Sequence, residues 1–481
     1  MSQQLVVIGA GMGGLSAAIY ARLHGYDVLV LEKSAQVGGK AAGVPIGPYM
    51  LDPGPSIIIL PRFYECVFHD AGRRMADYLT FDKLDVISRV FFGAQPALDL
   101  PDNEDACLEL LKQIEPNDAE ALKTLHQRLE KVEPLLEQSV YAHPFTHPMQ
   151  LLDPKLLRFG MGFNPLRTYK QLVDEMFRSP LVRAFFYGFP SYGGQNYNAK
   201  SPGAFLIPYY MLRDGVYFPR GGVRAIPLQF RRLAEELGVE FRFSAEVQSL
   251  GDGGSSIRWV ELSTGERIGA DAFVCNLDRF TFAKMRGEAI TAKPSYSYFT
   301  VHRGIRRSFS ELSHHNLFIP ENYEESFDDL YKRGEFPAEP IVYINSTSAI
   351  DPEAAPPGAS NVFAVVTSPA RVEGIDWTRD TESYRARVDL ALAKRGYSWR
   401  EEEVDFERIQ TPLYFEAEHG NYLGSLYGLD ERHRLWGMFP ASNHDSKWSN
   451  LTYCGGSVQP GAGLPMVTLS GKFAVNLLAN K

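Results

Sequence analysis

The hydrophobic pattern at the amino-terminal end predicts a strand, a tight turn, a helix and a second strand. Leu5–Ile8 is an unbroken apolar run, which is typical of a parallel strand buried on both faces. The next segment carries small apolar residues at helical spacing, and Gly25 is expected to end that helix. Val28–Leu31 repeats the continuous apolar pattern and ends at Glu32. This order predicts an α/β fold that opens with a β–α–β unit.

Three glycines occupy the first turn with the spacing Gly-x-Gly-x-x-Gly. Gly9 permits the turn, Gly11 lets a pyrophosphate approach the backbone, and Gly14 lets the helix pack close to the strand. The free amide groups at the start of the helix suit the phosphates. Glu32 stands 23 residues after Gly9, where a carboxylate can accept hydrogen bonds from a ribose 2′-hydroxyl. The unit predicts a Rossmann-type dinucleotide site and by itself leaves NAD and FAD open.

Two segments after Glu32 favour FAD. The first, "SAQVGGKAAG", places Gly39 and Lys40 where backbone amides and one cation could meet further phosphate or ribose groups. The second, "YMLDPGPSIIILP", adds Pro55 and Ser56. Each segment alone could be a surface turn, but the two together and in this order resemble the corresponding segments of flavoproteins built like amine oxidases and carotenoid desaturases, and this resemblance favours FAD.

The middle of the chain predicts a helical region, a hairpin series and a second sheet. Residues from about 100 to 180 are predicted to be helical, and the aromatic, glycine-rich stretch 181–220 fits either core packing or the wall of an apolar tunnel that opens at a membrane surface. The pattern over 239–276 predicts hairpins whose last, continuously apolar strand returns to the parallel sheet. Alternating strand-like and helix-like segments from 294 to about 410 predict a second sheet with helices on one face.

The composition is that of an ordinary globular protein, with 44% hydrophobic and 22% charged residues. The net charge of −9 argues against a general nucleic-acid binder. No apolar run of 18 residues is free of charge, so no membrane-spanning helix is expected, and the early strand leaves no room for a signal peptide. The scattered cysteines indicate neither a disulfide framework nor a metal site, which favours a cytoplasmic setting; they are Cys66, Cys107, Cys275 and Cys454.

The motifs together resemble the bacterial carotenoid desaturases, which are FAD-dependent members of the amine-oxidase-like flavoprotein superfamily. The resemblance runs over essentially the whole chain and includes "GAGMGGLSAA", "VGGKA", "LDPGPS", "GVYFPRGG", "CNLD", "TPLYFEAEHGNYLGSLYG" and the closing "CGGSVQPGAGLPMVTLSG". It implies that the closing glycine loop brings a second helix start to the same FAD. Carried over position by position, it implies cofactor contacts at Gly9, Gly11, Gly14, Glu32, Gly39, Lys40, Pro55, Ser56, Val247, Gly456, Met466 and Val467. Val247 fits equally well as a core valine.

The same resemblance implies an FAD-binding domain assembled from discontinuous segments. These are residues 1–95, 220–292 and 411–481. Residues 96–219 are expected to form a helical, membrane-facing tunnel subdomain, and residues 293–410 a mixed-sheet substrate domain.

The implied activity is the desaturation of an acyclic carotenoid, with transfer of a hydride to FAD and loss of a proton from the neighbouring carbon. Oxygen or a quinone would then take the electrons. A redox-neutral polyene isomerase or a saturase is an alternative, followed by an amine oxidase or a non-catalytic polyene-binding flavoprotein. Such a lipophilic substrate implies a peripheral position on the cytoplasmic membrane.

Two positions depart from the family pattern. Gln459 stands where most relatives have His, and Phe439 where many have Arg. Both are expected near the flavin or the inner end of the tunnel. Gln459 is therefore a candidate near-flavin residue, while no catalytic side chain can be assigned from the sequence, and the departures leave the exact substrate open.

Overall fold

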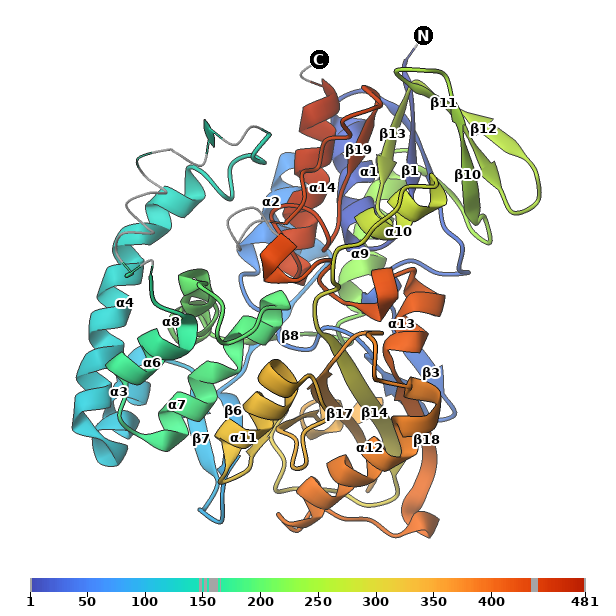
Figure 1. Ribbon diagram of the computed structural model, residues 1–481. Coiled ribbons are helices and arrows are strands. Elements are labelled where there is room, and N and C mark those ends of the chain that lie inside the picture. The colour runs from blue at the N-terminus through green and yellow to red at the C-terminus, as the bar shows by residue number, and fades with distance from the viewer. Residues whose placement is uncertain are drawn as a thin grey trace.

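The computed structural model describes residues 2–146, 149–150, 154, 163–164, 166–433 and 440–479. Phe439 lies outside the described residues. Figure 1 shows one sheet in the upper part of the molecule and another in the lower part, with a group of helices beside them. None of the described helices is both long enough and apolar enough to cross a membrane.

A five-stranded parallel sheet forms the upper part of the molecule (Figure 1), and its strands come from three distant stretches of the chain. In spatial order they are β19 (Leu451–Tyr453), β13 (Ala272–Cys275), β1 (Gln4–Ile8), β2 (Asp27–Leu31) and β9 (Glu240–Arg242). Leu5 pairs with Ala272, and Phe273 pairs with Leu451. The predicted return of an apolar strand to this sheet is therefore confirmed.

The strands of this sheet are continuously apolar because other elements pack on both of its faces. Leu5 and Val7 pack against a helical layer, whereas Val6 and Ile8 face a small antiparallel sheet. The helical layer consists of α1 (Met12–Leu23), α2 (Arg62–Asp70), α9 (Ala225–Glu236) and α14 (Leu464–Ala479). The antiparallel sheet consists of β10 (Val247–Asp252), β11 (Ile257–Leu262) and β12 (Arg267–Gly269).

A mixed seven-stranded sheet forms the lower part of the molecule, and β6 and β15 are its parallel pair. Its order is β18 (Val404–Gln410), β14 (Ser297–Ile305), β17 (Ser360–Ser368), β16 (Val342–Asn345), β15 (His315–Ile319), β6 (Val86–Phe92) and β7 (Leu98–Pro101). Helix α12 (Trp377–Ala393) packs on one face, as the sequence predicted. Strands β6 and β7 belong to this sheet. They lie on either side of residue 95, where the sequence predicts a domain boundary.

Helices from the middle of the chain pack around an aromatic core beside the two sheets. They are α3 (Glu104–Ile114), α4 (Pro116–Glu137), α6 (Tyr169–Met176), α7 (Pro180–Tyr187) and α8 (Leu206–Asp214). Short elements complete the described chain: β3 (Val44–Ile46), β4 (Tyr49–Leu51), β5 (Phe81–Lys83), β8 (Tyr217–Pro219), α10 (Arg279–Met285), α11 (Tyr323–Asp328) and α13 (Pro412–His419). The predicted division into domains stays a prediction.

Helices α1 and α14 touch backbone to backbone at Gly471. A Cβ atom at Gly471 would lie 2.5 Å from the carbonyl oxygen of Gly13 and 2.6 Å from the amide nitrogen of Ala17. The Ser16 hydroxyl also donates to the carbonyl of Thr468 at 2.6 Å. The missing side chain therefore sets how closely the two helices approach.

We predict that Gly471→Ala destabilises the protein by about 1–3 kcal/mol, because the added methyl group forces α14 away from α1. Gly269→Ala is the control, since its Cβ would come no closer than 3.4 Å to a neighbour. Chemical denaturation of both variants measures the difference. Equal stability of the two variants would contradict the close packing.

Candidate functional site

A cavity of about 1700 Å³ lies where the parallel sheet meets the seven-stranded sheet and the helical region. The residues at or just after the carboxyl ends of four parallel strands line it; they are Ile8, Glu32, Asn276 and Gly455. Ligands of open α/β sheets bind at this edge. The volume exceeds that of a typical small-molecule pocket, about 300–1,000 Å³, and so suits a large ligand or two ligands together.

The first glycine turn forms one wall of the cavity and has no room for side chains. Gly9 has a φ of +95°, and a Cβ at Gly14 would lie 2.0 Å from the Gly9 carbonyl oxygen. Cβ atoms at Gly11 and Gly13 would lie 2.8 and 2.6 Å from side-chain atoms of Asn276. The glycines therefore leave a bare backbone cradle, which fits the close approach of a pyrophosphate.

Two helix starts meet this cradle. Helix α1 begins after Gly11 with no side-chain cap, so its first amide groups are available to a ligand. Helix α14 begins at Leu464, and its first-turn residues Pro465, Met466 and Val467 also line the cavity. The positive ends of both helix dipoles thus face one space, and this arrangement fits a dinucleotide with its two phosphates.

Glu32 is fixed at the end of β2 by local hydrogen bonds. One carboxylate oxygen accepts from the amide of Ala10 at 2.7 Å, and the other from the amide and hydroxyl of Ser34 at 2.9 and 2.8 Å. An ionised carboxylate can accept about four hydrogen bonds. Glu32 therefore keeps capacity for a ribose hydroxyl, and its role in binding the ribose stays a prediction.

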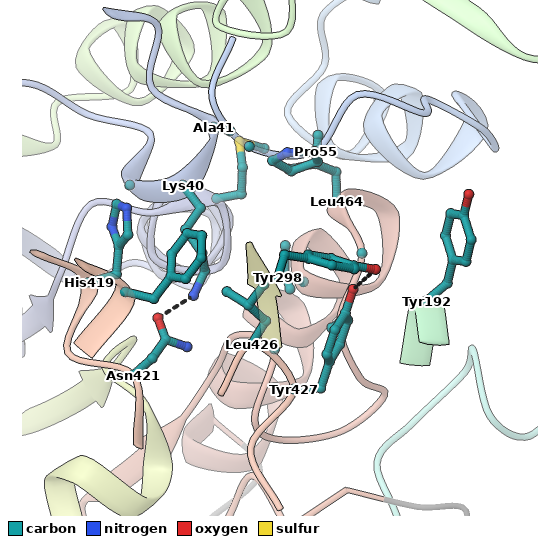
Figure 2. Close-up of a pocket in the computed structure, with 18 of the residues that line it drawn as sticks. Lys40, Ala41, Pro55, Tyr192, Tyr298, His419, Asn421, Leu426, Tyr427 and Leu464 are labelled. Atoms are coloured by element: carbon teal, nitrogen blue, oxygen red, sulfur yellow. Dashed lines mark hydrogen bonds between the residues drawn. The ribbon is translucent and has the colours of Figure 1, made fainter. Parts of the chain in front are cut away.

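Lys40 faces the cavity and donates from Nζ to Oδ1 of Asn421 at 2.9 Å (Figure 2). Its pKa is lowered by burial, and the negative charge of Asp278 partly offsets this. Burial and the cations of Lys40 and Lys33 lower the pKa of the nearby His419 to about 3, so its imidazole is neutral. Lys40 is thus held as a directed donor beside the glycine turn.

The cavity brings together most of the residues that the sequence singled out. Those that line it are Gly9, Gly11, Glu32, Gly39, Lys40, Pro55, Ser56, Val247, Gly456, Met466 and Val467. Gly14 does not line it and serves the packing of α1 instead. Four further lining residues were not predicted from the sequence, although they lie within the motifs "CNLD" and "EHGNYLG" that carry the family resemblance; they are Asn276, Asp278, His419 and Asn421.

Gln459 is buried, and its side chain does not line the cavity. Its Oε1 accepts from the amide of Phe145 at 2.7 Å, and its Nε2 donates to the carbonyl of the same residue at 3.2 Å. The amide group thus clamps the end of the helical region to the closing loop. Both polar atoms of the side chain are engaged with Phe145, and the neighbouring Pro460 lines the cavity.

The far part of the cavity is mainly apolar. Its wall includes Ile57, Phe185, Phe189, Leu206, Ile207, Met211, Phe327, Leu330, Ile341, Phe363 and Val365. Four carboxylates line the described cavity, Glu32, Glu246, Asp278 and Glu418, and none of them comes from the seven-stranded sheet or from the lining residues between 141 and 211. The charged lining side chain from that sheet is Arg408, which donates to the Tyr414 hydroxyl at 3.0 Å. The cavity thus has a polar end and a largely uncharged end.

The fold and the site are those of a flavin-dependent oxidoreductase. The chain belongs to the family of flavin-containing amine oxidoreductases, whose profile matches residues 12–479. Among solved structures it is similar to an oxidoreductase from Methanosarcina mazei, with a TM-score of 0.65 and 16% identity over 97% of this chain and 98% of that one. It is also similar to putrescine oxidase, with a TM-score of 0.61 and 15% identity over 100% of this chain and 99% of that one.

The curated relatives that the chain resembles are carotenoid desaturases and oxygenases. The chain is 31% identical to a zeta-carotene-forming phytoene desaturase of Myxococcus xanthus, over 99% of this chain and 94% of the relative. It is 30% identical to a 4,4'-diapolycopene oxygenase of Methylomonas sp, over 98% and 97% of the two chains. It is 28% identical to a 1-hydroxycarotenoid 3,4-desaturase of Flavobacterium sp., over 99% of each. The predicted family resemblance is confirmed, and the cofactor is FAD.

We predict that Gly11→Val abolishes most FAD binding, because the added side chain would crowd the cradle, where a Cβ atom would already lie 2.8 Å from Nδ2 of Asn276. The readout is the FAD-to-protein ratio, from absorbance, of the folded variant. Gly203→Val is the control, since Gly203 lines the same cavity from the helical region and a Cβ atom there would have no neighbour within 4 Å. Full flavin occupancy in Gly11→Val would show that the cradle is misplaced.

We predict that Gln459→Met lowers the free energy of unfolding by about 1–3 kcal/mol, because it removes the two hydrogen bonds that the Gln459 side chain makes with the backbone of Phe145. Gln95→Met, at an exposed position, should change stability by less than about 0.5 kcal/mol. Chemical denaturation measures both. If Gln459→Met were as stable as the control, the clamp would have no energetic role.

Proposed function

We propose that this protein desaturates an acyclic carotenoid-type polyene with FAD as the oxidant. The observation that carries the proposal is the large, uncharged, aromatic end of the cavity, joined directly to the dinucleotide cradle. The phytoene desaturase and the 1-hydroxycarotenoid desaturase among the relatives support it.

The chain's own residues supply binding, orientation and exclusion of water. When bound, FAD supplies an acceptor for a hydride from the substrate. The amide groups at the starts of α1 and α14 hold the phosphates, Glu32 accepts from the ribose, and Lys40 donates beside them. The apolar wall aligns a long hydrophobic molecule and keeps water away from it. Oxygen or a quinone, as the final oxidant, receives the two electrons.

An amine substrate fits this cavity less well. Amines are cationic near neutral pH, and a buried cation requires a paired anion. The substrate end offers no carboxylate among the lining residues from the seven-stranded sheet and the stretch 141–211. A redox-neutral polyene isomerase or a saturase would fit the same walls, and product analysis separates these from a desaturase.

We predict that an acyclic polyene bleaches the flavin absorbance of the purified protein in the absence of air. Phytoene is the first probe, and chromatography of the extracted pigments should reveal a product with more conjugated double bonds. An isomerised product with unbleached flavin would favour the isomerase, and a more saturated product would favour the saturase. Binding of phytoene with neither bleaching nor any product would contradict an enzyme of this class.

We further propose that the protein works as a peripheral protein on the cytoplasmic membrane, since its substrate dissolves in lipid. The aromatic side chains of 181–220 are mostly buried in the core, among them Phe186, Tyr187, Phe205 and Tyr209. More strongly exposed apolar side chains lie at Met149 and Leu166, which are 68% and 76% exposed. These two positions are therefore better candidates for lipid contact than the aromatic stretch.

We predict that the protein floats with lipid vesicles in a density gradient, and that Met149→Ser combined with Leu166→Ser weakens this flotation. Leu228→Ser, at another partly exposed leucine (46%) on α9, is the control. No flotation of the wild type would contradict the membrane proposal. Equal loss in the control would contradict the placement.

A further inference from the structure

A group of mostly hydroxyl-bearing side chains interrupts the apolar end of the cavity. We call it the hydroxyl band, and it consists of Ser56, Tyr192, Tyr298, His315, Tyr343 and Tyr427, all of which line the cavity. The side chains come from six separate elements of the chain: the loop after β4, the turn after α7, strands β14, β15 and β16, and the loop after α13. The apolar end of the cavity therefore contains hydrogen-bonding groups, and a ligand that is a pure hydrocarbon has no polar group to pair with them.

Most of the band is linked by short hydrogen bonds. The Tyr427 hydroxyl donates to the Tyr298 hydroxyl at 2.9 Å (Figure 2). The Tyr343 hydroxyl lies 2.8 Å from Oγ of Ser56 and 2.6 Å from Nδ1 of His315. Each hydroxyl can donate and accept, so these chains can reverse direction to suit a ligand.

The band is electrically neutral at physiological pH. Burial raises the pKa of the tyrosines in the band and lowers that of His315 well below its usual value. The phenols therefore stay protonated and the imidazole stays uncharged. A neutral set of donors and acceptors matches an uncharged oxygen group better than a carboxylate or an ammonium group.

Tyr192 is a member of the band with unused hydrogen-bonding capacity, and the Nε2 atom of His315 is likewise without a partner among the described residues. Tyr192 comes from the turn Phe189–Gly193, and its hydroxyl has no hydrogen-bond partner among the described residues. In the view of Figure 2 Tyr192 stands apart, and the Tyr298–Tyr427 pair lies between it and Lys40. A phenol enclosed in an apolar wall loses free energy unless it finds a partner. A hydrocarbon cannot supply that partner, whereas a substrate oxygen can.

We propose that the hydroxyl band binds an uncharged oxygen atom, a hydroxyl or a carbonyl, carried by the polyene, and that Tyr192 is a specificity-determining residue for it. The inference rests on the proposed function and narrows its substrate class to oxygenated polyenes.

The test measures binding to the FAD-loaded protein in detergent without air. The probes are 4,4'-diapolycopene, the polyene named for one relative, and the same polyene with one terminal hydroxyl group. We expect the wild type to bind the alcohol about tenfold more tightly, as one added hydrogen bond would give. Tyr192→Phe should remove this preference and change the affinity for the hydrocarbon by less than about twofold.

Tyr169→Phe is the matched control, because it removes a buried, unpartnered phenol that does not line the cavity. It should keep the tenfold preference. Equal affinity of the wild type for both probes, or a preference that survives in Tyr192→Phe, would overturn the inference. Flavin bleaching by phytoene in parallel samples tests the proposed function separately, because the two binding probes are already fully conjugated and cannot be desaturated. A preference without bleaching by phytoene supports the band and contradicts desaturation, and bleaching without a preference does the opposite.

Discussion

The contact between α1 and α14 is the constraint on which the site depends. These helices begin some 450 residues apart in the sequence, at Met12 and Leu464, and they pack with backbone against backbone at Gly471. Since each follows a strand of the same parallel sheet, their amino-terminal ends arrive at one edge. The contact thereby places two sets of free amide groups around a single cavity, where each alone would form only part of a dinucleotide site.

Charge is distributed unevenly around that cavity, so its two ends suit two different kinds of ligand. Lys40, Glu32 and Asp278 lie beside the glycine turn, where a cofactor with phosphates and ribose groups needs charged partners. The walls from the seven-stranded sheet and the helical region are aromatic and aliphatic, with neutral hydroxyl groups between them. Arg408 is a charged side chain of that sheet that also lines the cavity. A charged ligand is stabilised at the first end, and a long uncharged one at the second.

Local patterns in the sequence were sufficient for the elements that build the parallel sheet. The unbroken apolar runs at Leu5–Ile8 and Val28–Leu31 and the spacing of Gly9, Gly11 and Gly14 each reflect a requirement of the immediate backbone. The family resemblance then supplied the link to the closing loop. Most predicted cofactor positions accordingly line the cavity, while their contacts with FAD stay predictions.

Features that depend on distant partners could not be predicted in this way. Strand β6 joins the seven-stranded sheet by pairing with β15, more than 200 residues later. The hydrophobic pattern of β6 does not identify that partner strand. The position of Gln459 near the flavin stays a prediction, and the sequence did not show that the backbone of Phe145 sets the orientation of its side chain. The hydroxyl band likewise exists only after distant elements of the chain have met.

The central claim is that one cavity holds FAD at the glycine turns and an uncharged polyene beyond it. A crystal structure of the FAD-loaded protein soaked with a polyene tests this most directly. We expect density for the adenosine ribose beside Glu32, and density for the polyene between Phe189 and Val365. Density for the polyene on the outer surface only, or for FAD away from the starts of α1 and α14, would contradict it.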